Sequence, residues 1–215
     1  DPDDLDDPRE IWDCERMIRQ KAFVYIGLST LSNNTVGAAI GSMLLSDITA
    51  VAGARYNYEG NRDSVAVLVD EAYEVINEPT LQLLNKGRGA GFDVTLFAQT
   101  VPDFAARLGN ENSAYQFLGN LNNVISMRVI DEKSQKYVGA RLGMVPVQRI
   151  EMSRNTGTST EENVIHFRGG VSYSLKEKEA ERFPVTELQS LPNLHFIANI
   201  AGGTLIKGRL PAVVG

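Results

Sequence analysis

The chain has 215 residues, and 43% of them are hydrophobic, which is enough for one substantial core or for two small domains. The formal net charge is −6, of which residues 1–10 carry −5, leaving −1 for the rest by subtraction. Because the chain carries no net positive charge, it is not a protein that binds nucleic acid over its whole surface. One cysteine, Cys14, and two histidines exclude an internal disulfide and a zinc cage, and they favour a reducing cytoplasm.

The first residues are acidic, unlike a signal peptide, and no run approaches the roughly 18 to 20 uninterrupted apolar residues of a membrane span. We therefore expect a soluble fragment. Asp7 and Pro8 predict the start of a short helix that ends near Arg19. Residues 22–28 read as a buried strand, and apolar residues at three- and four-residue spacing then predict the longest helix, over about 36–56.

Residues 65–71 read Val-Ala-Val-Leu-Val-Asp-Glu. Five consecutive apolar residues are typical of a strand covered on both faces, as in a parallel sheet, and Asp70 and Glu71 then lie at its carboxyl end. Two interpretations stay open from the motif alone. The carboxylates either cap the following helix, or one holds Mg²⁺ and the other polarises a water molecule for nucleotide hydrolysis.

The middle of the chain alternates between predicted helices and strands. Pro79 begins a short helix that stops at the glycines of 87–91, and a strand over 92–98 ends in Gln99. The pattern then predicts helices near 102–108 and 114–118, a strand over 123–130, and a helix capped by Asp131 that ends near Leu142. Such alternation predicts a parallel sheet with helices on its faces.

The composition of the chain changes after Pro146. Residues 153–163 are rich in Ser and Thr and predict a mobile surface loop between two short strands. Capping-box spacings that begin at Ser174 and Thr186 predict two short helices. Residues 194–200 and 204–209, separated by Gly202-Gly203, predict a terminal hairpin.

Gln99 and Arg88 each allow two interpretations. The Gln99 amide either senses a terminal phosphate beside the carboxylates or satisfies a turn. Arg88 and Lys86 either neutralise the negative end of a helix dipole, or Arg88 reaches a nucleotide on a neighbouring subunit. The glycines of 87–91 follow a helix and lack the Gly-Lys-Ser/Thr ending, so they are not a phosphate loop.

No Gly-x-x-x-x-Gly-Lys-[Ser/Thr] motif occurs in the chain, which argues against an ATPase that works by itself. His166 and His195 have no acid, cysteine or serine arrangement around them in the sequence, so we expect structural roles for both. Lys207 and Arg209 are expected to be exposed strand charges, with a DNA contact as the alternative.

Several separated segments together resemble TraD-type conjugative coupling proteins, especially those of integrative conjugative elements. They are Val-Leu-Val-Asp70-Glu71-Ala, Leu-Leu-Asn-Lys86-Gly87-Arg88-Gly-Ala-Gly, Phe-Ala-Gln99-Thr, Leu-Pro-Asn-Leu-His195-Phe and Gly-Gly-Thr-Leu-Ile-Lys207-Gly-Arg209-Leu-Pro. The resemblance runs from about Asp1 to Pro211, and the joint order of the motifs is far more specific than any one of them.

This resemblance implies a hexameric RecA-like motor on the cytoplasmic face of the bacterial inner membrane. Such a motor uses ATP and Mg²⁺ to deliver single-stranded DNA and relaxase to a type IV secretion channel. Asp70 would correspond to the Walker B magnesium carboxylate and Glu71 to the catalytic carboxylate. Gln99 would be the phosphate sensor, which makes these three the cofactor-binding residues, and Arg88 would be the arginine finger in trans.

The chain lacks the phosphate loop, membrane helices and all-α domain of that family, so it resembles the carboxyl-terminal part of a larger protein. The expected fold is α/β: a mostly parallel RecA-like P-loop ATPase sheet with helices on both faces, lacking the phosphate-loop strand, with a C-terminal β-hairpin. The expected parts are an acidic segment and helix over 1–21, a partial motor domain over 22–145, and strands, loop and hairpin over 146–215.

In a RecA-like strand order, the missing strand lies between the one ending in Gln99 and the one near 124–130. We expect the gap to be closed by direct pairing of these two strands, by another segment or by an exchanged strand, because an open buried edge leaves backbone groups unpaired. The chain alone is expected to bind no nucleotide tightly and to be inactive. The alternatives are a non-catalytic docking module for relaxosome or channel proteins, and a DNA motor of the FtsK or HerA type.

Overall fold

The computed structural model describes residues 12–28, 33–58, 63–161, 164–200 and 202–212, with the backbone alone for the described part of 155–170. The chain forms two compact units, residues 1–122 and 123–215, and each is described by itself. The expected helix start at Asp7 and Pro8 lies outside the described residues.

The helices of the first unit begin with α1 (Cys14–Arg19), which Asp13 caps by accepting from the amide of Arg16. Residues 22–28, expected to be a strand, are irregular and pair with no described strand, and the Phe23 side chain is 98% exposed. The long helix α2 (Asn34–Tyr58) confirms its prediction. By length and composition α2 could cross a membrane. It contacts α1 and α3 and contributes Ala52 to a core cluster, as the packing helix of a globular unit does.

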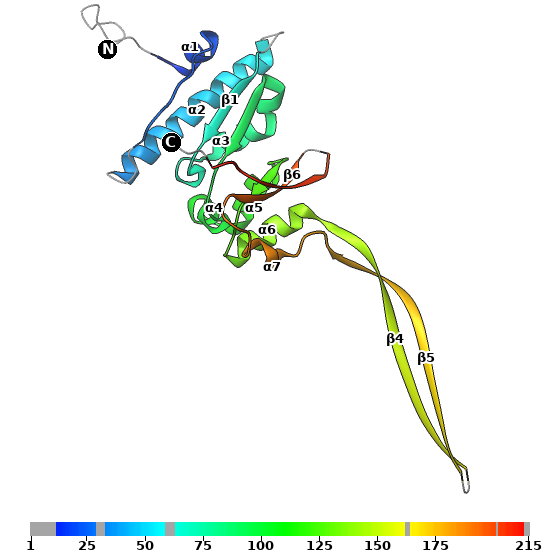
Figure 1. Ribbon diagram of the computed structural model, residues 1–215. Helices are drawn as coiled ribbons and strands as arrows, with labels where there is room; N and C mark the ends of the chain where they lie inside the picture. The colour runs from blue at the N-terminus through cyan, green and yellow to red at the C-terminus, as the bar shows by residue number, and fades with distance from the viewer. Residues whose placement is uncertain (1–11, 29–32, 59–62, 162–163, 201, 213–215) are drawn as a thin grey trace, which may run out of the picture. The chain divides into compact units, whose positions relative to one another are not determined.

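The first unit contains a two-stranded parallel sheet, β1 (Val65–Val69) and β2 (Phe92–Leu96). Between them the chain forms η1 (Ala72–Glu74), α3 (Glu78–Lys86) and η2 (Gly87–Ala90). This helical connection is long enough for the crossover that two parallel strands require. One face of the sheet packs against α2 and α3 through a hydrophobic cluster. The cluster consists of Ala52, Leu83, Ala90 and Phe92, with Val65, Val67 and Val94 packed against it. Figure 1 shows α2 and α3 beside β1.

The other face of this sheet is exposed, and Leu68 on it is 67% accessible. The expectation of helices on both faces was therefore wrong for the described residues. The apolar run of β1 contributes side chains to both faces, but α2 and α3 occupy only one of them. The unit is completed by α4 (Val101–Leu108) and α5 (Glu111–Gly119), which pack through the rings of Phe104 and Phe117, with centroids 5.9 Å apart.

The second unit is built on a three-stranded antiparallel sheet of β3 (Val124–Ser126), β6 (His195–Ile200) and β7 (Thr204–Arg209), in the order β3-β6-β7. The predicted terminal hairpin is confirmed, and Gly202 and Gly203 turn it with positive φ values of 95° and 78°. Helices α6 (Glu132–Leu142) and α7 (Val185–Leu188) complete the core, which is formed by Val138, Leu142, Leu188, Leu191 and Ile197.

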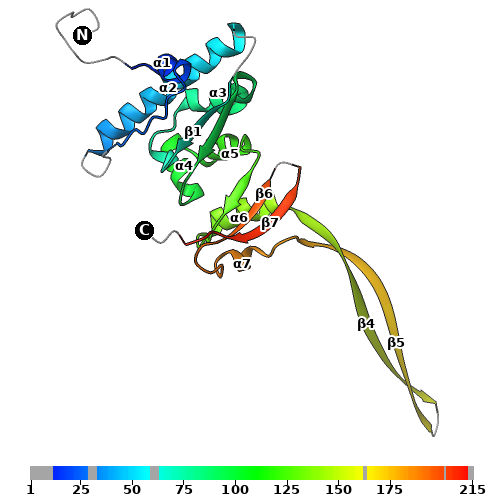
Figure 2. The same cartoon turned by 45° about the horizontal axis from the view of Figure 1, so that its top comes forward.

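A long antiparallel hairpin replaces the mobile loop expected over 153–163 and the helix expected at Ser174. Strands β4 (Met144–Glu161) and β5 (Val164–Glu181) pair over 18 residues each, and Figures 1 and 2 show them as a twisted two-stranded ribbon. Apolar and polar residues alternate over 149–153 and 171–176, the middle parts of the two strands, and Thr and Ser are compatible with strands. This two-residue period prevails over the capping-box spacing from Ser174, whereas α7 confirms the second short helix.

Only β1 and β2 form a parallel pair among the described strands, so the chain is mixed α/β and the expected mostly parallel sheet was wrong here. Strands joined by a tight turn run antiparallel, as β6 and β7 do. The strand β3 also pairs with β6 in antiparallel orientation, so the second unit contributes no parallel pair. Since β2 and β3 belong to different sheets, the described residues show no direct pairing of these two neighbours.

Candidate functional site

The carboxyl ends of β1 and β2 place the sequence-predicted carboxylates and glutamine at one edge. Val69 and Leu96 form the last register pair, and the Phe97 amide donates to the Val69 carbonyl oxygen at 2.9 Å. Directly beyond, the Ala72 amide donates to the Phe97 carbonyl oxygen at 2.9 Å. The chain segments that carry Asp70, Glu71 and Gln99 therefore emerge side by side, at the edge where open α/β sheets bind ligands.

Asp70 and Glu71 form a tight turn with an unusual backbone. Glu71 has φ 47° and ψ 46°, in the left-handed region that a residue with a Cβ seldom adopts. Its amide donates to Oδ1 of Asp70 at 3.0 Å, and its carbonyl oxygen accepts from the Glu74 amide at 2.9 Å. Both carboxylate side chains are exposed. The turn therefore presents two adjacent carboxylates to solvent at the strand end.

The segment that follows the acidic turn is anchored to the helices around it. Ala72 is fully buried, and Ile76 is 1% exposed. Arg107 of α4 donates through Nε to the Ile76 carbonyl oxygen at 3.2 Å and through a terminal nitrogen to Oγ of Ser42 at 3.0 Å. Ser42 of α2 in turn donates to the Val75 carbonyl oxygen at 2.8 Å.

Asn77 extends this anchor and begins α3. Its side-chain nitrogen donates to the Ser42 carbonyl oxygen at 2.8 Å and to Oγ of Ser46 at 2.9 Å. Its side-chain oxygen accepts from the amide of Thr80 at 3.1 Å, which caps the helix. Pro79 indicates the helix start in the sequence, but no local signal indicates the roles of Arg107 and Ser42, because both depend on contacts across the fold.

The pKa of Tyr73 reflects the carboxylates that surround this edge. Partial burial raises the pKa of its hydroxyl above the ordinary value, because the phenolate loses hydration. The carboxylates of Glu71, Glu74 and Asp103 raise that pKa further, in this order. Asp103 lies in the first turn of α4, where its amide donates to Oγ1 of the capping Thr100 at 3.3 Å. The strand-end edge is therefore a region of negative potential, which favours a cation.

Arg88 lies at the other end of the sheet. It belongs to η2, which directly precedes β2, whereas Gln99 follows β2. Because β1 and β2 are parallel, Arg88 lies at their amino-terminal edge and the carboxylates lie at their carboxyl-terminal edge. Its side chain is exposed. Within one chain the structure does not bring Arg88 to Asp70 and Glu71, so any joint role requires a second copy.

The donor set at this edge fits the metal half of a Mg-nucleotide site. Mg²⁺ bound to a nucleotide keeps several water molecules and needs only one or two protein carboxylates, which Asp70 and Glu71 supply. The described residues contain no group of three or more His, Cys, Asp or Glu side chains that could hold a metal by themselves. The phosphate half is missing, because the chain has no Gly-Lys-Ser/Thr loop to surround phosphate oxygens.

The other sequence-predicted positions belong to the second unit. The ring Nδ1 of His195 lies 3.2 Å from the Asn193 carbonyl oxygen, a local turn contact that agrees with a structural role. The side chain of His166 lies outside the described residues. Lys207 and Arg209 are exposed on β7, as expected, and Lys207 also lies 6.0 Å from the ring centroid of Phe183.

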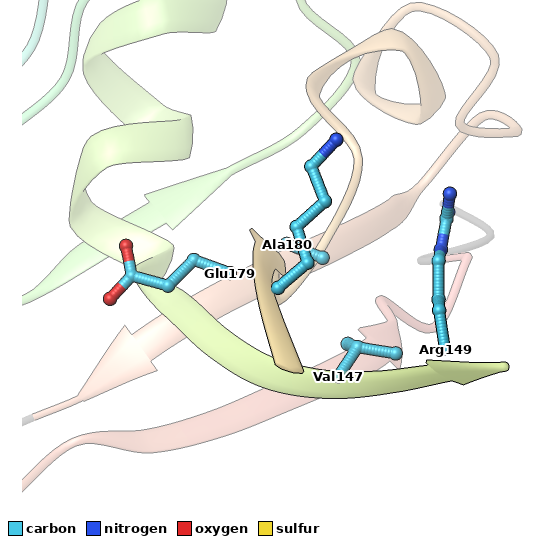
Figure 3. A pocket seen from close by; sticks show the side chains of 5 residues that line it. Val147, Arg149, Glu179 and Ala180 are labelled. Atoms are coloured by element: carbon cyan, nitrogen blue, oxygen red, sulfur yellow. The ribbon is translucent and has the colours of Figure 1, made fainter. Parts of the chain in front are cut away.

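A hollow of about 210 Å³ lies at the base of the β4–β5 hairpin, well below the roughly 300 Å³ of small-molecule pockets. Figure 3 shows Arg149 standing on one side of the ribbon and Glu179 pointing away from it. The lining residues are Val147, Arg149, Lys178, Glu179 and Ala180. None of them is one of the residues of the candidate site.

Two solved structures share this fold. A bacterial conjugative coupling protein, TrwBdeltaN70, in its unbound monoclinic form is 17% identical with a TM-score of 0.57, covering 78% of this chain and 36% of that one. The trigonal form of TrwBdeltaN70 in complex with sulphate is 15% identical with a TM-score of 0.58, covering 80% of this chain and 38% of that one. The chain thus spans less than two fifths of the structures that it matches, and no curated protein matches it.

The fold and the strand-end motifs define the carboxyl-terminal region of a conjugative coupling protein. The family model described as "TraM recognition site of TraD and TraG" matches residues 64–193, which is more than half of the chain. The chain belongs to this family, and the resemblance to TraD-type coupling proteins drawn from the sequence motifs is confirmed.

Proposed function

We propose that this chain is the Walker B part of a coupling protein that uses ATP to move single-stranded DNA and relaxase into a type IV secretion channel during conjugation. The observation that carries the proposal is the common edge of Asp70, Glu71 and Gln99 at the ends of two parallel strands. Membership of the TraD and TraG family supports it. The same membership favours a coupling protein over a FtsK- or HerA-type motor.

Each residue of this edge has a separate role in the proposed phosphoryl transfer. Bound Mg-ATP would supply the γ-phosphate and a divalent charge. Asp70 would hold Mg²⁺ through its water shell, and Glu71 would accept a hydrogen bond from the attacking water and polarise it. Gln99 donates its amide to the terminal phosphate from the neighbouring strand end. The anchored segment from Ala72 to Asn77 keeps the Glu71 carboxylate in place.

Arg88 acts in the parent protein as a finger in trans. Its exposed position at the opposite edge of the sheet suits a contact with the next copy in a ring. There its guanidinium would stabilise the negative charge that develops on the transferring phosphoryl group. This role requires an active site shared between adjacent copies, and with the family resemblance it is consistent with a parent protein that is a hexamer on the cytoplasmic face of the inner membrane.

The rest of a RecA-like sheet would come from outside this chain. One face of the β1–β2 sheet is exposed, and no other described strand pairs with its outer edges, so there is room for further strands and helices. The lack of a phosphate loop means that the chain by itself binds ATP weakly and does not hydrolyse it. Isothermal calorimetry of the chain with Mg-ATP tests this point, and micromolar binding would contradict it.

A docking module for the relaxosome is the second candidate function, because the family description names recognition of TraM. Replacing Glu71 by Gln in the complete protein separates the two candidates. The substitution keeps the size of the side chain and removes its charge. A motor then loses ATP hydrolysis and DNA transfer while relaxosome binding persists. Unchanged DNA transfer in the Glu71→Gln protein would exclude the catalytic assignment.

A further inference from the structure

The β4–β5 hairpin sorts its side chains onto two different faces. In an antiparallel pair, residues directly opposite one another point to the same face, and successive rows alternate between faces. Four successive rows of one face are Gln148 with Glu177, Ile150 with Leu175, Met152 with Tyr173, and Arg154 with Val171. We call this the apolar face of the hairpin. The two central rows are entirely apolar, and one charged residue lies at each end.

The opposite face is suited to water. Its rows are Val147 with Lys178, Arg149 with Lys176, Glu151 with Ser174, and Ser153 with Ser172. Nζ of Lys176 lies 2.7 Å from a carboxylate oxygen of Glu151, and Figure 3 shows Arg149 standing clear of the ribbon. The two faces of one ribbon therefore differ sharply in polarity.

The apolar face is open to solvent in the single chain. Its five apolar side chains are 46% to 69% exposed: Ile150, Met152, Val171, Tyr173 and Leu175. A two-stranded hairpin alone is marginally stable in water, and contiguous exposed apolar side chains mark an interaction site. Covering this face would remove apolar surface from water and stabilise the long ribbon.

We propose that the apolar face packs against the same face of a second copy of this chain, with the two hairpins antiparallel about a two-fold axis. The axis passes between the row of Ile150 and the row of Met152. It places Ile150 against the partner subunit's Met152, and Leu175 against the partner subunit's Tyr173. The two apolar rows of each copy are then fully covered by the two apolar rows of the other.

The charges at the ends of the face select this arrangement. The two-fold operation brings the row of Arg154 against the row that contains the partner subunit's Glu177, and it does so twice. Face-to-face sheets lie about 10 Å apart, a gap that the long side chains of Arg and Glu bridge. A parallel arrangement would instead set the row of Arg154 against the same row of the partner subunit, which places two like charges in neighbouring positions and leaves Glu177 without an opposite charge.

The size of the face sets the strength of the association. Stable interfaces bury at least about 1,200 Å², and five large apolar side chains from each copy are of that order. The expected complex is therefore a dimer of modest affinity that forms with rising concentration. This contact is isologous, with the same residues on both copies, so it joins chains in pairs. It is independent of the ring contact proposed for Arg88, and its failure would leave the proposed function untouched.

Sedimentation velocity of the 215-residue chain over a concentration series tests the proposal. We expect a monomer–dimer equilibrium, in which Arg154→Glu and Glu177→Arg each raise the dimer Kd at least about tenfold. The combined charge exchange restores a Kd within about threefold of the original. Arg149→Glu and Lys178→Glu, on the opposite face of the same strands, are the matched controls and leave the Kd unchanged.

Two further variants keep the test open if a charge variant misfolds. Ile150→Thr and Leu175→Thr preserve strand propensity and remove apolar surface, so both are expected to be monomeric with unchanged far-ultraviolet circular dichroism. Three results would overturn the proposal: a chain that stays monomeric at every concentration, single charge variants that dimerise normally, or a charge exchange that restores nothing.

Discussion

The backbone amide of Ala72 donates to the carbonyl oxygen of Phe97 at 2.9 Å, one step beyond the last register pair of β1 and β2. This bond ties the turn that carries Glu71 to the segment that leads to Gln99. Because Ala72 is fully buried, the bond is shielded from competing water. The two strand ends therefore move together, and the spacing between the acidic pair and the glutamine is a property of the fold.

Replacing Glu71 by Gly is expected to stabilise the chain. Glu71 has a positive φ of 47°, which costs a residue with a Cβ roughly 1 kcal/mol and costs glycine almost nothing. We expect the free energy of unfolding to rise by up to about 1 kcal/mol in urea titrations. The control is Glu74→Gly, two residues after the buried Ala72 in η1, where φ is not positive and glycine should destabilise by about 0.5–1 kcal/mol. An equal loss of unfolding free energy in both variants would show that the backbone of Glu71 is not strained.

Arg107 is expected to stabilise the acidic turn from a distance. Its guanidinium bonds the Ile76 carbonyl oxygen and Oγ of Ser42, so Arg107→Ala removes both bonds and leaves the Ile76 oxygen without this donor. The expected loss in unfolding free energy is about 1–2 kcal/mol. Arg88→Ala removes an exposed guanidinium of the same unit and should change stability by less than about 0.5 kcal/mol. A difference between the two variants near zero would show that the Arg107 bonds contribute nothing.

Cys14 is expected to be unreactive and to make stability fall in alkali. Burial raises the pKa of the thiol from 9.0 to about 12, together with the hydrogen bond that the thiol donates to the Asp47 carboxylate and the negative charge of that carboxylate. The unfolded chain therefore releases the thiol proton at lower pH than the folded chain does. Between about pH 9 and 12 the folded state binds more protons, so this group makes the free energy of unfolding fall as pH rises.

The comparison with Cys14→Ser isolates this effect, since serine does not titrate in that range. The stability difference between the two proteins should shrink or reverse from pH 8 to pH 11, as measured by urea unfolding. At pH 8 the native thiol should also react with iodoacetamide at least about a hundredfold more slowly than in the urea-unfolded chain. A native rate close to the unfolded rate would show that the thiol is not protected.

The sequence predicted the strand-end site better than it predicted the sheet around it. Val65 to Glu71 carries its own signal, because an apolar run that ends in two acids is a local pattern. Which face of the strand is covered by helices, in contrast, depends on residues far away in the sequence. Leu68 and Val67 are alike in sequence, yet Leu68 is exposed while Val67 packs against the α2 and α3 cluster. Only the positions of the helices decide which face of the strand is covered.

The hairpin shows a second limit of local reading. Ser174 and Glu177 have the spacing of a capping box, and the Ser/Thr-rich stretch from Ser153 has the composition of a loop. Both signals concern a few neighbouring residues. The period-two pattern of Ile150 and Met152, paired with Leu175 and Tyr173, becomes decisive only once the two segments are aligned in register. Composition alone cannot supply that alignment.

Two glycines of α2 provide a matched test of how tightly the helix packs against the segment after the acidic turn. A Cβ built on Gly41 would lie 2.4 Å from Cγ1 of Val75 and 3.0 Å from its Cβ, so Gly41→Ala forces Val75 to move. A Cβ on Gly53 meets nothing within 4 Å. Alanine is the better helix former by about 1 kcal/mol at either position, so the helix propensity term is the same for both.

The expected outcomes therefore have opposite signs. Gly53→Ala should raise the free energy of unfolding by up to about 1 kcal/mol, because only the propensity changes. Gly41→Ala should lower it by about 1–3 kcal/mol, because overpacking outweighs the same gain. Urea unfolding of both variants measures the difference. If Gly41→Ala proved as stabilising as Gly53→Ala, α2 would not pack closely against Val75, and the anchoring of the acidic turn by Ser42 on the same helix would need revision.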